Sequence, residues 1–128
     1  MKVLVSTIPF AEINPQPIET LRNMGAEVTI NPLGRKLKDV DLMKLIPEFD
    51  VLIAGTESIN RKVLEKANRL KLIARVGIGL DNVDLIMARE RGIMVTYTPD
   101  APSPAVAELT IGLMIDLLRS VRCFLVGR

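Results

Sequence analysis

The sequence contains no histidine and no tryptophan, and aromatic residues make up only 3% of its 128 residues. Histidine is the side chain used most often for proton transfer near neutral pH, and zinc sites are built mainly from histidine and cysteine. The single cysteine, Cys123, allows no internal disulfide and suits a reducing cytoplasm. Because the residues of most enzyme chemistry are missing, we expect no metal site and no catalytic residue in this chain.

Charge and hydropathy exclude two further classes of function. The net charge of +2 at pH 7 is too small for the electrostatic footprint of a nucleic-acid-binding protein. No apolar stretch approaches the ~18 residues that span a membrane, and the apolar run at residues 1–5 is too short for a signal peptide. We therefore expect a cytoplasmic protein with neither a nucleic-acid partner nor a membrane partner.

Short runs rich in β-branched residues alternate with segments of helical periodicity. We expect strands at residues 2–6, 27–30, 51–54, 71–76 and 93–97. We expect helices at residues 15–24, 39–46 and 60–68, and one that begins at an Asp81 or Asn82 cap and ends at Arg91. Because helices separate the strands and hairpin turns are missing, the strands must be joined by parallel crossovers. This predicts an α/β fold, an open parallel sheet of about five strands in the flavodoxin-like order 2-1-3-4-5, with helices on both faces.

The last predicted helix is too apolar to lie on a single sheet. It begins at an expected Ser103 cap, with Pro104 in the first turn, and runs to about Val121. One narrow stripe of this helix holds Glu108, Gly112, Asp116, Arg119 and Arg122, and nearly all the other residues are apolar. A helix that lies on one sheet is apolar over a single stripe only. We favour packing against a second domain or a second copy of the chain, and an unusually apolar core helix is the alternative.

Residues 74–84, ARVGIGLDNVD, begin like a dinucleotide-binding fingerprint, in which a strand, a glycine-rich turn and a helix follow one another. The full pattern G-x-G-x-x-G requires a third glycine where this chain has Asn82, and an acidic residue at the end of the next strand. The next strand is expected to end at Tyr97, and the first acid after it is Asp100, in a proline-rich loop. The sequence therefore does not predict a complete dinucleotide site here.

The same glycines favour a site for a small carboxylate. Ligands of open α/β sheets bind beyond the carboxyl ends of the strands, in the loops expected at residues 7–10, 55–58, 77–82 and 98–103. Gly77 and Gly79 permit close approach of the backbone to a ligand, and exposed N–H groups form an anion-binding concavity. Arg75 or Arg89 adds positive charge if either side chain points inward. The alternative is a tight turn without a ligand.

Three segments in order, LKLIARVGIGLDNVDL, RGIMVTYTP and SPAVAELTIGLMIDLLRSV, resemble the N-terminal part of the D-isomer-specific 2-hydroxyacid dehydrogenases, in the style of the phosphoglycerate dehydrogenase-like branch. The resemblance implies a substrate-binding domain at residues 1–99. It further implies a crossover loop and helix at residues 100–128 that lead into an NAD-binding domain. It also implies that the backbone amides of Val76, Gly77 and Ile78 hold the substrate carboxylate. Our candidate substrate-binding residues are Thr56, Arg75, Val76, Gly77, Ile78 and Gly79.

The resemblance also implies a function for the full-length protein, hydride transfer between NAD(H) and a small 2-oxo or 2-hydroxy acid. The cofactor loop, the carbonyl-polarising arginine and the Glu–His pair of such enzymes would all lie after Val121, so we expect the isolated chain to be inactive. At two positions this sequence differs from the family pattern. Gly55 stands where many phosphoglycerate dehydrogenases carry arginine, and Pro102 removes a backbone donor. The alternative is a non-catalytic module that binds a small acid or forms a homodimer through its C-terminal helix.

Overall fold

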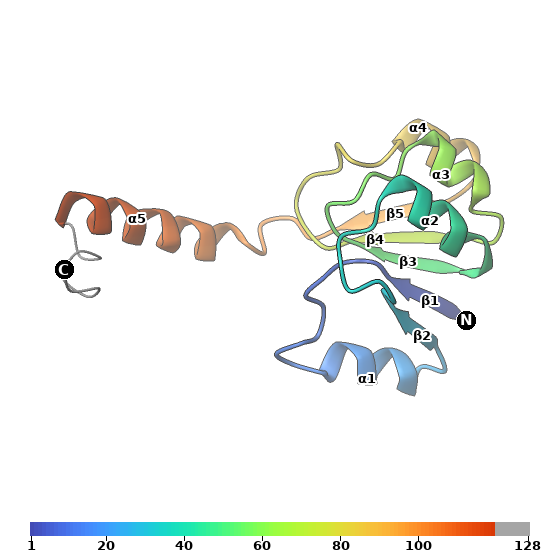
Figure 1. Ribbon diagram of the computed structural model, residues 1–128, viewed down its shortest axis with the longest axis horizontal. Helices are drawn as coiled ribbons and strands as arrows, with labels where there is room; N and C mark the ends of the chain where they lie inside the picture. Colours follow the sequence, from blue (N-terminus) through green and yellow to red (C-terminus); the bar gives the residue numbers. More distant parts are fainter. Residues whose placement is uncertain (120–128) are drawn as a thin grey trace. The chain divides into compact units, whose positions relative to one another are not determined.

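Strands and helices alternate along the computed structural model, which describes residues 1–119 (Figure 1). The strands are β1 (Lys2–Val5), β2 (Glu27–Ile30), β3 (Val51–Ala54), β4 (Leu72–Arg75) and β5 (Met94–Tyr97). The helices are α1 (Gln16–Asn23), α2 (Asp39–Leu45), the short 3-10 helix Ile46–Glu48, α3 (Arg61–Lys66), α4 (Leu85–Glu90) and α5 (Ser103–Arg119). The strands form one parallel sheet in the order β2-β1-β3-β4-β5, which confirms the predicted fold and topology. Their carboxyl ends therefore meet along one edge.

Successive residues of each strand face opposite sides of the sheet, and each side has its own apolar cluster. Leu4 and Leu52 lie on the side packed against α2, α3 and α4, in the larger cluster, and are fully buried. Val3 and Ile53 belong to a smaller cluster on the side of α1 (Figure 1). Since burying such a side chain stabilises the fold by roughly 1.5–3 kcal/mol, most hydrophobic stabilisation of the sheet comes from the side of the larger cluster.

The helix starts agree with the sequence at α3 and differ at α4. The Asn60 side chain caps α3 as expected, accepting a hydrogen bond from the Val63 N–H at 3.2 Å. Helix α4 is capped instead by Asp84, whose carboxylate accepts from the Met87 N–H at 2.9 Å, so the expected cap at Asp81 or Asn82 is wrong. The physical reason is that the Asn82 side chain donates to backbone carbonyls of the neighbouring loop, after β3, and does not cap α4.

The chain divides into two compact units, Met1–Thr98 and Pro99–Arg128. The long C-terminal helix is confirmed as α5, and Ser103 is its first helical residue rather than its cap. No residue of α5 is buried, and Leu117 and Leu118 are more than three-quarters exposed. The expected end of this helix near Val121, and Cys123, lie outside the described residues. Within residues 1–119, no helix combines the length and apolar character needed to cross a bilayer.

Candidate functional site

The loop after β4 has a backbone shape that only glycine adopts easily at position 77. The Val76 N–H makes the last bond of the sheet here, donating to the Ala54 carbonyl at 2.8 Å. Gly77 then has φ of +143°, a region that residues with a Cβ rarely enter. A Cβ at this position would also lie 2.5 Å from Nη1 of Arg75. The glycine therefore lets the chain turn away from the sheet while the guanidinium lies against it.

The predicted carboxylate-binding amides differ in whether they already have a partner. The Val76 N–H is used in the sheet, and the Gly77 N–H donates to the Thr98 hydroxyl at 2.9 Å. Across residues 1–119, the N–H groups of Ile78 and Gly79 donate no hydrogen bond. Ile78 is also 47% exposed, so solvent reaches this part of the loop. The donors available to a ligand are therefore the amides of Ile78 and Gly79.

Arg75 places a positive charge beside Gly77, in the same loop as these amides. Its Nε donates to Oδ1 of Asn82 at 3.2 Å, and its Nη1 donates to the Val76 carbonyl. The two bonds hold the half-buried side chain along the loop, where its guanidinium lies next to Gly77. Adjacent backbone donors and a fixed cation favour binding of a small anion.

Asn82 joins the loop after β4 to the loop after β3. Its side-chain amide donates to the backbone carbonyls of Gly55 and Glu57, at 3.2 and 2.6 Å. The backbone carbonyl of Asn82 accepts a hydrogen bond from the Ile59 N–H at 2.7 Å. From the sequence, Asn82 is predicted only as a helix cap that stands in place of the third glycine. The residue type itself could have indicated this role, because the side chain of an asparagine in a loop can both donate to and accept from the backbone of a neighbouring loop.

A buried carboxylate connects the loop after β3 to β1. Glu57 is only 3% exposed, and it accepts hydrogen bonds from the Ser6 hydroxyl and from the Gly55 N–H. Any side chain at Gly55 would collide with the Thr7 hydroxyl, so this position has no room for a larger residue without rearrangement. The candidate residue Thr56 is exposed and lines a cavity of about 200 Å³ together with Ser6, Thr7, Ile8, Lys36 and Glu57.

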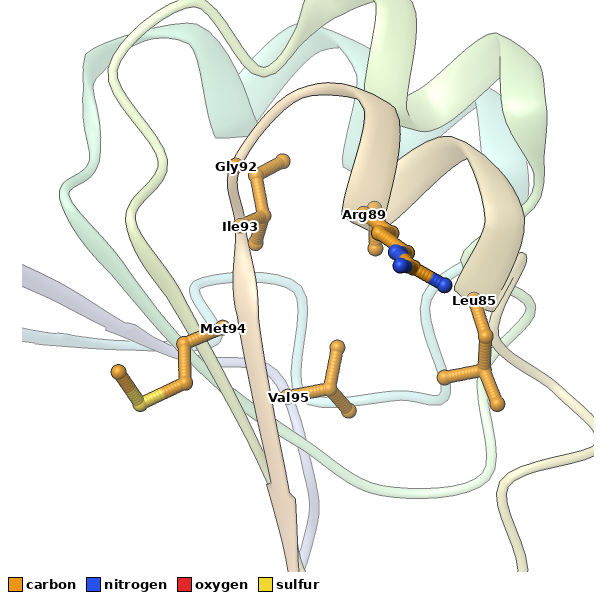
Figure 2. Close-up of a pocket in the computed structure, with 7 residues that line it drawn as sticks. Leu85, Arg89, Gly92, Ile93, Met94 and Val95 are labelled. Carbon is orange, nitrogen blue, oxygen red and sulfur yellow. The ribbon is translucent and has the colours of Figure 1, made fainter.

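Of the two arginines considered as a source of charge, only Arg75 adjoins the glycine loop. Arg89 lies on α4, in a cavity of about 360 Å³ between that helix and β5 (Figure 2). The lining of this cavity is otherwise mostly apolar, with Leu85, Ala88, Gly92, Ile93, Met94 and Val95. Arg75 is thus the cation placed to support a ligand at Ile78 and Gly79.

The glycine loop does not fit the phosphates of a dinucleotide. Such a site places the pyrophosphate at the N-terminus of the helix that directly follows the glycines. Here α4 begins only at Leu85, and Asn82, at the place of the third glycine, holds the loop after β3. The arrangement suits a compact anion such as a carboxylate.

The fold defines a class, an open parallel α/β domain of the kind that binds ligands at the carboxyl edge of its sheet. The family model described as "D-isomer specific 2-hydroxyacid dehydrogenase, catalytic domain" matches residues 3–122. The chain therefore belongs to the D-isomer specific 2-hydroxyacid dehydrogenase family, as its sequence motifs predicted.

Relatives of known name agree with this membership. The chain is 47% identical over 123 residues to the D-3-phosphoglycerate dehydrogenase of Methanocaldococcus jannaschii, a match that covers 94% of this chain and 22% of that protein. It is 46% identical over 86 residues to the hydroxypyruvate reductase of Thermotoga maritima, covering 66% of this chain and 28% of the reductase. The crystal structure of cofactor (NAD+)-bound 3-phosphoglycerate dehydrogenase in Entamoeba histolytica matches with a TM-score of 0.79 and 33% identity, over 91% of this chain and 38% of that one. The chain thus spans less than a third of the length of these two curated relatives.

Proposed function

We propose that this chain is the N-terminal, substrate-binding part of an NAD-dependent 2-hydroxyacid dehydrogenase. Residues 1–99 bind a small 2-oxo or 2-hydroxy acid, and residues 100–128 form the crossover loop and helix that lead into an NAD-binding domain. The observation that carries the proposal is the pair of partnerless amides at Ile78 and Gly79, in a loop where the Arg75 guanidinium lies against Gly77. Family members act on acids of this class, and their carboxylate is the group that such a cradle recognises.

The proposed substrate carries no phosphate. The named relatives act on hydroxypyruvate and on phosphoglycerate, so both classes are candidates. The loop after β3 presents Gly55 and the buried carboxylate of Glu57, and an arginine fork for phosphate is missing there. The lack of an arginine at position 55 supports a small unphosphorylated 2-oxo acid such as hydroxypyruvate or glyoxylate.

The chemistry of hydride transfer needs groups that this chain does not supply. A nicotinamide cofactor supplies the hydride when it is bound, and a proton donor completes the reduction of a 2-oxo acid. The chain has no histidine to act as that donor, and its glycine loop does not fit a dinucleotide. Its own contribution is to bind and orient the acid by the carboxylate. We expect NADH oxidation with glyoxylate, hydroxypyruvate or pyruvate to stay at the protein-free rate, and measurable turnover would contradict this.

Binding of oxalate, an unreactive analogue of a small 2-oxo acid, tests the site directly. Arg75→Gln removes the charge beside the amides, and we expect oxalate affinity measured by calorimetry to fall about tenfold or more, as for a lost charge-assisted hydrogen bond. Arg89→Gln is the matched control, since that arginine lies in the cavity between α4 and β5. Equal loss in both variants would indicate a general effect of net charge and would contradict the proposed site.

A second candidate function rests on α5, whose apolar residues are all exposed. Leu109, Leu113 and Leu117 follow one another at four-residue spacing, and each is more than half exposed. Exposed apolar surface of this kind marks an interaction site, which favours a non-catalytic, acid-binding module that forms a homodimer through α5. Sedimentation equilibrium tests this. We expect a dimer that Leu113→Glu converts to monomer and that Glu108→Gln leaves intact, whereas a monomeric wild type would exclude the dimer.

A further inference from the structure

Thr98 binds both polar groups of the Gly77 backbone. Its hydroxyl accepts a hydrogen bond from the Gly77 N–H at 2.9 Å, and its own N–H donates to the Gly77 carbonyl at 3.1 Å. Thr98 directly follows β5 and Gly77 lies two residues after β4, so the pair continues the contact between these strands beyond their ends. The following Pro99 restricts Thr98 to extended backbone conformations, which helps to hold it in place.

These two bonds fix the peptide planes on either side of Gly77. A trans peptide unit is planar, and its C=O and N–H point in opposite directions. The Gly77 carbonyl and the Ile78 N–H share one such unit, so holding the carbonyl on Thr98 directs the Ile78 N–H away from Thr98. The Val76 carbonyl and the Gly77 N–H share the other unit, so the Thr98 hydroxyl turns that carbonyl the opposite way, where Arg75 donates to it.

We infer that Thr98 is a positioning residue of the carboxylate site, an inference that rests on the proposed function. Glycine is the residue with the widest choice of backbone conformations, and Gly77 sits at φ +143° directly before the Ile78 donor. Without the Thr98 hydroxyl, the unit that ends in the Gly77 N–H loses its partner and the loop samples other orientations. Thr98 thus orients the Ile78 amide and the Arg75 guanidinium together, and it does so without touching the ligand.

Three substitutions separate this role from a general effect on folding. Thr98→Val keeps the shape and the backbone N–H but removes the hydroxyl, and Thr98→Ser restores the hydroxyl. Thr96→Val makes the same chemical change at an exposed position two residues earlier on β5. Oxalate affinity and the hydrogen-exchange rate of the Gly77 amide are measured for each, with thermal unfolding as the check on the fold.

We expect Thr98→Val to weaken oxalate binding about three- to tenfold, the effect of one neutral hydrogen bond, and to accelerate exchange at Gly77. Thr98→Ser should recover at least half of the lost binding, and Thr96→Val should match the wild type. Equal affinity of wild type and Thr98→Val would overturn the role of Thr98 and leave the carboxylate site standing. Tighter binding by Thr98→Val would overturn it too, because the hydroxyl would then compete with the ligand for the Gly77 amide. Absence of oxalate binding by the wild type would overturn the site and this inference together.

Discussion

The guanidinium of Arg75 occupies the space that a side chain at position 77 would need, since a Cβ built on Gly77 would lie 2.5 Å from Nη1. The same glycine has φ of +143°, so its lack of a side chain is required twice, by the backbone and by the neighbouring cation. Both requirements act on the same loop, so we expect a substitution at position 77 to change stability and ligand binding together.

Gly77→Ala should lower the free energy of unfolding by about 1–3 kcal/mol, the cost of holding a residue with a Cβ in such a conformation. It should also displace Arg75 and weaken oxalate binding at least tenfold. Urea unfolding and calorimetry measure the two effects. Gly34→Ala is the control, because Gly34 also has a positive φ, +61°, but has open space around it. It should lose stability while keeping oxalate affinity, and a Gly77→Ala protein that binds normally would refute the steric argument.

Asn82→Ala should destabilise the fold by about 1–3 kcal/mol, because it leaves the carbonyls of Gly55 and Glu57 without their donor and Arg75 Nε without its acceptor. Chemical unfolding gives the change. Asn68→Ala, which removes an exposed side-chain amide, should change the stability by less than about 0.5 kcal/mol. If both variants lose a similar free energy of unfolding, the hydrogen bonds that Asn82 makes between the loops after β3 and β4 do not stabilise the fold more than an exposed amide does.

Asp84→Ala should cost about 1 kcal/mol, the usual value of a helix N-cap, since its carboxylate caps α4 through the Met87 N–H. Asp81→Ala, at a position that the sequence offered as the cap, should be nearly neutral. Comparing the two unfolding free energies decides between the caps. A larger loss for the Asp81 variant would place the start of α4 earlier than the structure does.

Asp50 should make the stability depend on acid pH. The backbone N–H of Lys2 and the guanidinium of Arg69 donate to its carboxylate and hold its pKa below the usual value for aspartate. Because the folded state binds this proton less readily than the unfolded state, the stabilisation is present above the unfolded-state pKa of about 4. It is lost as the pH falls further, through the lowered pKa of the folded state. Unfolding free energies of wild type and Asp50→Asn should therefore converge toward low pH, and a constant difference from pH 7 to pH 2 would contradict this.

The sequence was sufficient for the sheet order and for α3, because these depend on local alternation and on a cap that contacts its own helix. The cap of α4 was placed wrongly because Asn82 bonds to Gly55, 27 positions earlier in the chain. Thr98 and Glu57 escaped prediction for the same reason. Their partners, Gly77 and Ser6, lie 21 and 51 positions away, and only the fold brings them together. The glycine spacing did locate the candidate loop, but which of its amides already have partners depends on contacts with β3 and with Thr98.

Titration of the wild-type chain with oxalate, followed by amide chemical shifts, tests whether the loop after β4 binds a carboxylate. We expect saturable shifts of the Ile78 and Gly79 amides, with smaller changes at Gly77 and Thr98 and none at Arg89. Saturable shifts confined to the cavity between α4 and β5, or no saturable shifts at all, would contradict the assignment of a carboxylate site to the loop after β4.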